Sequence, residues 1–172
     1  TVLVYMVGSD LESRDSAGST DLAEMMQVGS SANIKVVVAT GGANKDGWRT
    51  VKRRLINAGS ETELSDLGNL SMGNPNTLQE FITWGVATYP ADKYALVMWD
   101  HGGGAIGNPA TGTLGPDENH NDALSLPEIK QALQNAYNTT GKKFDLIGFD
   151  ACLMATLETA HTVSPYANYL VA

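Results

Sequence analysis

Short, continuously apolar segments recur along this chain and alternate with segments of helical periodicity. Four such runs, each followed within two residues by Gly or Asp, cover residues 2–7, 34–39, 94–99 and 144–149. Runs this short and rich in β-branched residues are typical of buried strands. Helical spacing lies between them, at residues 21–28, 75–88 and 126–137. This alternation indicates a parallel sheet covered on both faces, so we predict an α/β fold.

Two further segments resemble strands but differ from these runs. Residues 48–56 (WRTVKRRLI) mix apolar and basic side chains after a turn, so we interpret them as an exposed strand or half of a hairpin with a solvated basic face. Residues 169–172 read as the start of a fifth strand. They stop short of the usual length of roughly 5 to 6 residues, so we expect further C-terminal sequence.

Composition limits the classes of function. The length of 172 residues and a hydrophobic content of 42% suffice for one domain with a core. An excess of 19 acidic over 11 basic residues gives a net charge of −8, which argues against a nucleic acid partner. No apolar run reaches the roughly 18 to 20 residues of a membrane helix, so we expect no membrane span. The single cysteine, Cys152, excludes an internal disulfide.

Two strands are followed by residues that can carry chemistry. The run at 94–99 leads into Asp100, His101 and three glycines at 102–104, and the run at 144–149 leads into Asp150, Ala151 and Cys152. Ligands of open parallel sheets bind beyond the carboxyl ends of the strands, where both sets of residues are expected. Ser9 and Asp10 follow the first strand at this edge, where they border a substrate or simply form a helix cap or a turn.

Cys152 and His101 each have a functional and a purely structural interpretation. Helical spacing at 153–161 would put Cys152 near a helix N-terminus, which favours the nucleophilic thiolate, although a lone cysteine can also be a small buried hydrophobe. The glycines after His101 allow close approach of a substrate and offer N–H groups to an oxyanion. The alternative is a glycine-rich turn with an incidental histidine. A phosphate loop is disfavoured, because the Lys and Ser/Thr of a P-loop are missing.

Three sequence motifs resemble those of a known family. HGGG after YALVMWD, GFDACLMATLE after a buried run, and the opening VLVYMVGSDLES are similar to the clostripain family of caspase-like (clan CD) cysteine peptidases. The His and Cys motifs occur in the right order, about 50 residues apart. The resemblance implies a caspase-like three-layer α/β/α sandwich with a mostly parallel sheet. Residues 1–172 would be the N-terminal part of the peptidase domain, carrying both catalytic residues of a secreted or cell-surface bacterial enzyme.

The same resemblance implies roles for individual residues. Cys152 would attack a peptide bond to form a thioester, with His101 as general acid and base and the N–H groups of Gly102 and Cys152 holding the oxyanion. Asp150 matches the family's carboxylate for a basic residue before the scissile bond, so cleavage after Arg or Lys is expected. Asp150 could instead cap the following helix. The expected partners are proteins or peptides with such a basic residue, and a C-terminal chain of the same precursor.

Calcium binding and proteolytic processing concern other segments of the chain. The chemistry requires no cofactor and no metal, but some relatives depend on calcium, and residues 117–122 form an acidic, oxygen-rich loop. Its spacing differs from the EF-hand pattern, so a plain solvated loop is the alternative to a Ca²⁺ site. Family members are often processed between the His and Cys strands, yet residues 111–124 contain no Lys or Arg. Self-cleavage there is not expected.

Two readings other than a peptidase remain open from the sequence. The first is a non-catalytic peptide-binding or regulatory module that keeps the caspase-like sheet without turnover. The second is an unrelated doubly wound domain that binds metal in the acidic loop and a small ligand in the crevice. An inert Cys152 lying far from His101 would favour the second reading.

Overall fold

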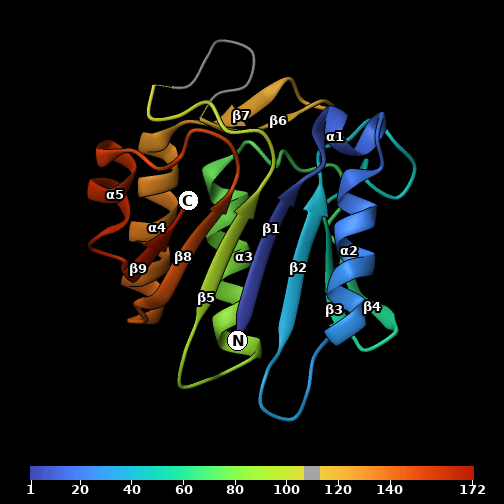
Figure 1. Ribbon diagram of the computed structural model, residues 1–172, viewed down its shortest axis with the longest axis horizontal. Helices are drawn as coiled ribbons and strands as arrows, with labels where there is room; N and C mark the ends of the chain where they lie inside the picture. The colour runs from blue at the N-terminus through green and yellow to red at the C-terminus, as the bar shows by residue number, and fades with distance from the viewer. Residues whose placement is uncertain (107–112) are drawn as a thin grey trace.

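The computed structural model describes residues 1–106 and 113–172, and a seven-stranded sheet forms its centre (Figure 1). The strand order is β4-β3-β2-β1-β5-β8-β9. Five neighbouring strands run parallel, in the order β2, β1, β5, β8 and β9. Strands β3 and β4 add an antiparallel hairpin at the β2 edge. Their bounds are β1 Val2–Val7, β2 Val36–Gly41, β3 Lys52–Asn57, β4 Ser60–Asp66, β5 Ala95–Trp99, β8 Phe144–Asp150 and β9 Ala167–Val171.

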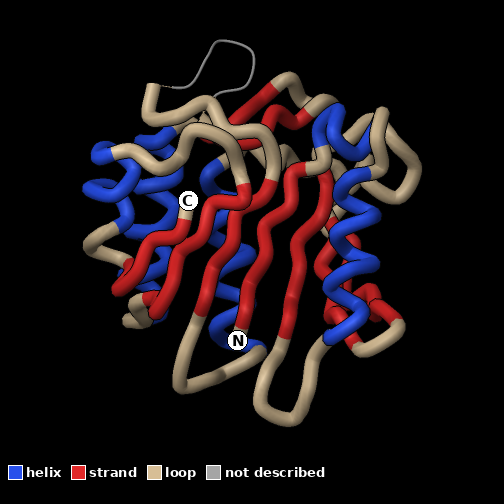
Figure 2. The backbone as a smooth tube through the Cα atoms, viewed as in Figure 1, coloured by secondary structure: helices blue, strands red, loops and turns tan. Residues whose placement is uncertain are grey.

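Helices cover both faces of this sheet (Figure 2). One face packs against α3 (Pro75–Thr88), α4 (Leu126–Thr140) and α5 (Leu157–Val163), and the larger apolar core lies between these layers. The opposite face packs against α2 (Ala17–Val28) in a smaller core. The fold is therefore the three-layer α/β/α arrangement with a mostly parallel sheet that the sequence predicts. None of the described helices is long and apolar enough to cross a membrane.

Strand β3 forms half of a hairpin with β4, as expected, but its basic side chains differ from the expectation. The basic residues of β3 do not form a solvated face, because Lys52, Arg53 and Arg54 are half-buried or buried and each has a partner. The Arg54 side chain is buried, donates to Thr40 Oγ1 at 3.0 Å and pairs with Glu61. The Arg53 guanidinium lies 4.4 Å from the ring centre of Trp84, close enough for a cation–π contact.

A short second hairpin lies above the carboxyl edge of the main sheet. It consists of β6 (Leu114–Asp117) and β7 (Asp122–Leu124), which flank the acidic segment that the sequence indicates as a loop. Residues 111 and 112, the first of the stretch without Lys or Arg, lie outside the described part of the chain. The helix after the hairpin begins at a capping box, in which Ser125 and Glu128 each bond the other's backbone N–H.

Candidate active site

Three neighbouring parallel strands, β1, β5 and β8, end at the same edge of the sheet (Figure 1). After β1 the chain continues through Gly8 into α1 (Ser9–Ser13), and after β5 it continues into Asp100 and His101. Asp150 is the last residue of β8, and Cys152 follows two residues later. The candidate residues that are separated along the sequence thus converge because their strands are adjacent.

Cys152 lies exposed in a turn rather than at the start of a helix. The predicted helix at 153–161 is wrong at its beginning, because Leu153 has a left-handed backbone with φ of 62° and α5 starts only at Leu157. Thr156 caps that helix through its side chain, so the alternative hypothesis that Asp150 is the cap is wrong. The helix dipole therefore cannot account for a reactive thiol, since its effect fades within the first turn.

The loop after β5 packs directly on the peptide of Cys152. A Cβ atom placed on Gly102 would lie 1.9 Å from the Cys152 carbonyl oxygen and 2.9 Å from its nitrogen. Only glycine allows this approach. Within residues 1–106 and 113–172, no backbone acceptor pairs with the N–H groups of Gly102 and Cys152.

Asp10, at the start of α1, contacts the imidazole of His101. Its Oδ1 lies 2.9 Å from His101 Nε2, and both side chains are about two-fifths exposed, at 39% and 38%. The sequence places Asp10 only at a substrate border or in a turn. A pairing with His101 could not be predicted, because it depends on β1 and β5 being neighbours in the sheet.

Ser9 and Asp100, which directly precede Asp10 and His101 in the chain, form a buried pair. Ser9 Oγ donates to Asp100 Oδ1 at 2.7 Å, and the same oxygen accepts the N–H of His101. The other carboxyl oxygen of Asp100 has no partner among the described residues. Burial raises the pKa of Asp100 to about 8, although the hydrogen bonds from Ser9 and His101 oppose this shift. Asp100 is therefore mainly protonated at neutral pH.

Asp150 borders a groove of about 530 Å³ on the α2 side of the sheet. Met6, Val97 and Trp99 contribute apolar side chains from the strands. Asp21 and Glu24 of α2 add two further carboxyl groups, and Asp21 accepts a 2.7 Å hydrogen bond from the Trp99 indole. The groove thus combines apolar walls with acidic groups, a composition suited to a long cationic side chain.

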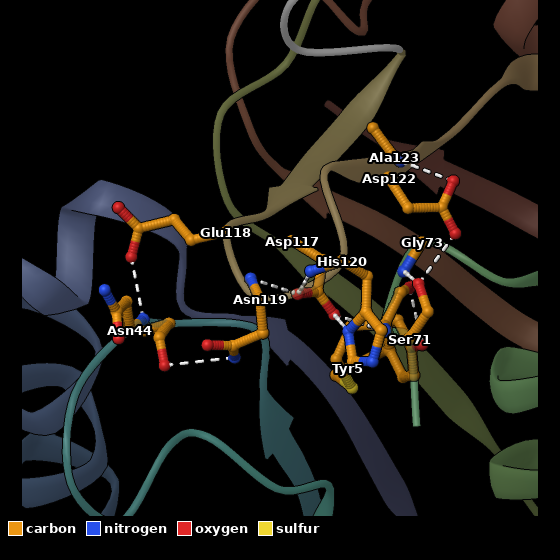
Figure 3. A network of polar contacts seen from close by, with 12 residues as sticks. Tyr5, Asn44, Ser71, Gly73, Asp117, Glu118, Asn119, His120, Asp122 and Ala123 are labelled. Carbon is orange, nitrogen blue, oxygen red and sulfur yellow. Dashed lines mark hydrogen bonds and ion pairs between the residues drawn. The ribbon is translucent and has the colours of Figure 1, made fainter. Parts of the chain in front are cut away.

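The acidic loop at 117–122 is folded onto the protein (Figure 3). Asp117 is 1% exposed rather than solvated, and its oxygens accept from the N–H groups of Met72 and Asn119 at 2.8 Å. Asp122 accepts from Ser71 Oγ at 2.7 Å. Among the described residues no group of three His, Cys, Asp or Glu side chains is arranged to hold a metal. A role for calcium stays a prediction.

Comparison with known proteins places these features in a family context. A profile of the clostripain family matches residues 4–172. Clostripain from Hathewaya histolytica is 38% identical over 104 residues, a match that covers 55% of this chain and 19% of clostripain.

Solved structures extend the similarity to nearly the whole chain. A secreted C11 cysteine protease from Bacteroides thetaiotaomicron, solved in complex with an irreversible peptide inhibitor, is 25% identical with a TM-score of 0.76, covering 98% of this chain and 47% of its own. An inactive zymogen C11 protease from Parabacteroides distasonis shares the fold at 23% identity and a TM-score of 0.73, with coverages of 98% and 46%. The caspase-like architecture is thereby confirmed. The chain spans about half the length of these two solved relatives.

Proposed function

This chain belongs to the clostripain family of cysteine peptidases, and we propose that the full-length protein is an endopeptidase that cleaves after Arg or Lys. The observation that carries the proposal is the contact between Gly102 and the Cys152 peptide. It joins the loop that holds His101 to the loop that holds the single cysteine of the chain. Two N–H groups without backbone acceptors in the described chain lie at this junction.

The proposed reaction proceeds through a thioester. Cys152 Sγ, having lost its proton to His101, attacks the carbonyl carbon of the scissile bond, and the N–H groups of Gly102 and Cys152 bind the oxyanion. His101 then returns the proton to the leaving amine, and the thioester remains. A water molecule, deprotonated by His101, hydrolyses the thioester and restores the thiol. No cofactor takes part in these steps.

Specificity for a basic residue is proposed to come from Asp150. Its carboxylate at the edge of the groove can pair with a guanidinium through two hydrogen bonds, or with an ammonium as a point charge. Asp21 and Glu24 line the same groove and make it more attractive to cations. The net charge of −8 also favours the approach of cationic substrates.

A C-terminal part of the same precursor is proposed to complete the domain. The chain spans only 46–47% of two solved relatives, and one feature of the structure would suit additional polypeptide. The edge strand β9 carries exposed Tyr169 and Val171, side chains that a further strand could cover. Secretion or attachment at a bacterial surface is proposed on the basis of the relative described as secreted.

The direct test is hydrolysis of fluorogenic peptides ending in Arg, Lys, Asp or Leu by the full-length protein. Cleavage after Arg or Lys that stops on thiol alkylation and in Cys152→Ala supports the proposal. Because Cys152 is exposed, the variant should unfold at the same denaturant concentration as the wild type. Wild-type turnover in Cys152→Ala would refute the mechanism, and no cleavage of any peptide would favour the non-catalytic binding module. A parallel assay with a calcium chelator tests the calcium prediction.

A further inference from the structure

We infer that Asp10 is a positioning residue for His101, so that the proposed Cys–His pair acts with a third, carboxylate member. The inference rests on the proposed function for its catalytic meaning, but its geometry does not. Asp10 Oδ1 lies 2.9 Å from His101 Nε2, within hydrogen-bonding distance. The second oxygen, Oδ2, faces Arg14 Nη1 at 3.5 Å, so each carboxyl oxygen has its own partner.

The contact between Asp10 and His101 is positioned by buried residues of α1 on both sides of Asp10 in the chain, rather than by the two exposed side chains themselves. At one end, Ser9 is 0% exposed and bonds the buried Asp100 through its hydroxyl. Further along α1, Glu12 is also 0% exposed, pairs with Lys45 Nζ at 2.6 Å and accepts the N–H of Ser19 at 2.7 Å. These anchors fix the backbone of Asp10 relative to β5, so the pairing does not depend on the weak surface contact with Arg14.

The paired strand ends hold His101 by two successive residues. Ser9 and Asp10 follow β1, while Asp100 and His101 follow β5, and each residue of one pair bonds its counterpart in the other. Asp100 also accepts the His101 N–H, which fixes the backbone of the histidine. Asp10 then fixes the ring. His101 is thus restrained at both its backbone and its side chain.

This arrangement determines which ring nitrogen can accept a proton. An ionised carboxylate only accepts hydrogen bonds, so in the neutral ring Nε2 carries the hydrogen and donates to Asp10. The lone pair is left on Nδ1. When the proton leaves Cys152 Sγ and binds Nδ1, Nε2 keeps its hydrogen, and the new imidazolium lies beside the Asp10 carboxylate. The charge is conserved, and the cation is stabilised where it forms.

The experiment compares full-length wild-type protein with Asp10→Ala and with Asp15→Ala as the matched control. Asp15 lies just beyond α1 and is exposed, so its substitution removes the same charge from an open position. We expect Asp10→Ala to lower kcat about 10- to 100-fold with little change in KM, because a misoriented base slows chemistry rather than binding. Asp15→Ala should retain the wild-type kcat.

A spectroscopic measurement separates this inference from the peptidase proposal. Long-range ¹H–¹⁵N spectra of histidine-labelled protein report the tautomer of His101, assigned through a His101→Asn variant. The neutral wild-type ring should be wholly protonated at Nε2, and Asp10→Ala should show a mixture of the two tautomers. This result would support the inference even if the protein cleaved no peptide. A mixed or Nδ1-protonated ring in the wild type, or identical kcat in an active Asp10→Ala, would overturn it.

Discussion

Gly102 lies so close to Cys152 that a Cβ atom on the glycine would be 1.9 Å from the cysteine carbonyl oxygen. This contact lies between two parallel neighbours in the sheet, since Gly102 follows β5 and Cys152 follows β8. It gives the glycine after His101 a steric role in addition to any hydrogen bond from its N–H group. The atoms that limit it are backbone atoms, which cannot rotate away as a flexible side chain can.

Gly102→Ala is therefore expected to displace the Cys152 peptide and to reduce kcat about 100-fold, the scale associated with a misplacement of roughly 1 Å. Gly148→Ala is the matched control, because a Cβ atom there meets its nearest neighbours at an ordinary 3.6 Å. Steady-state kinetics and urea unfolding of both variants make the test. Equal, near-wild-type activity in both would show that the Cys152 peptide tolerates the displacement.

The buried Asp100 is expected to make stability depend on pH. Its pKa is about 8 in the folded protein, whereas an unfolded aspartate titrates near 3.9, so the folded state binds an additional proton between these values. The contribution of Asp100 to the stability of the folded state is fully present below about pH 4. It decreases as pH rises, and the decrease ends above about pH 8. The loss approaches about 1.4 kcal/mol per pH unit.

Asp100→Asn should remove this dependence while keeping the side chain's size. Urea unfolding of the wild type and the variant at several pH values between about 5 and 8 measures the difference in unfolding free energy. We expect the unfolding free energy of the variant to increase relative to that of the wild type as pH rises. If the unfolding free energies of the two proteins changed equally with pH across this range, an elevated pKa of Asp100 would be contradicted.

Asp150→Asn is expected to lower kcat/KM for substrates ending in Arg by about 30-fold or more, since it removes one partner of a charge-assisted pair. Stability should change little, because Asp150 is exposed at the end of β8. Glu24→Gln supplies the control: Glu24 lines the same groove from α2 and has the same charge. An equal loss in both variants would indicate general electrostatic attraction instead of a specific contact with Asp150.

Much of the fold could be predicted because it follows from local patterns. The apolar run Val2–Val7 and the helix Pro75–Thr88 have the bounds that periodicity indicates. The last apolar residues do form a fifth parallel strand, but β9 begins already at Ala167 and its 5 residues do not stop short of the usual length. Ser125 begins its helix as its residue type favours. Leu153 shows where local reasoning fails: its side chain suits a helix, yet its left-handed backbone delays the helix by several residues beyond Cys152.

The sequence by itself determined the class of fold and the chemical groups at the strand ends. Both follow from local features, namely the apolar pattern of each strand and the residues that come directly after it. Only the tertiary structure decided which strand ends are neighbours. Asp10 meets His101, and Gly102 meets Cys152, because β1, β5 and β8 are adjacent in the sheet. Strand order arises from packing between segments far apart in sequence, so no local pattern specifies these contacts.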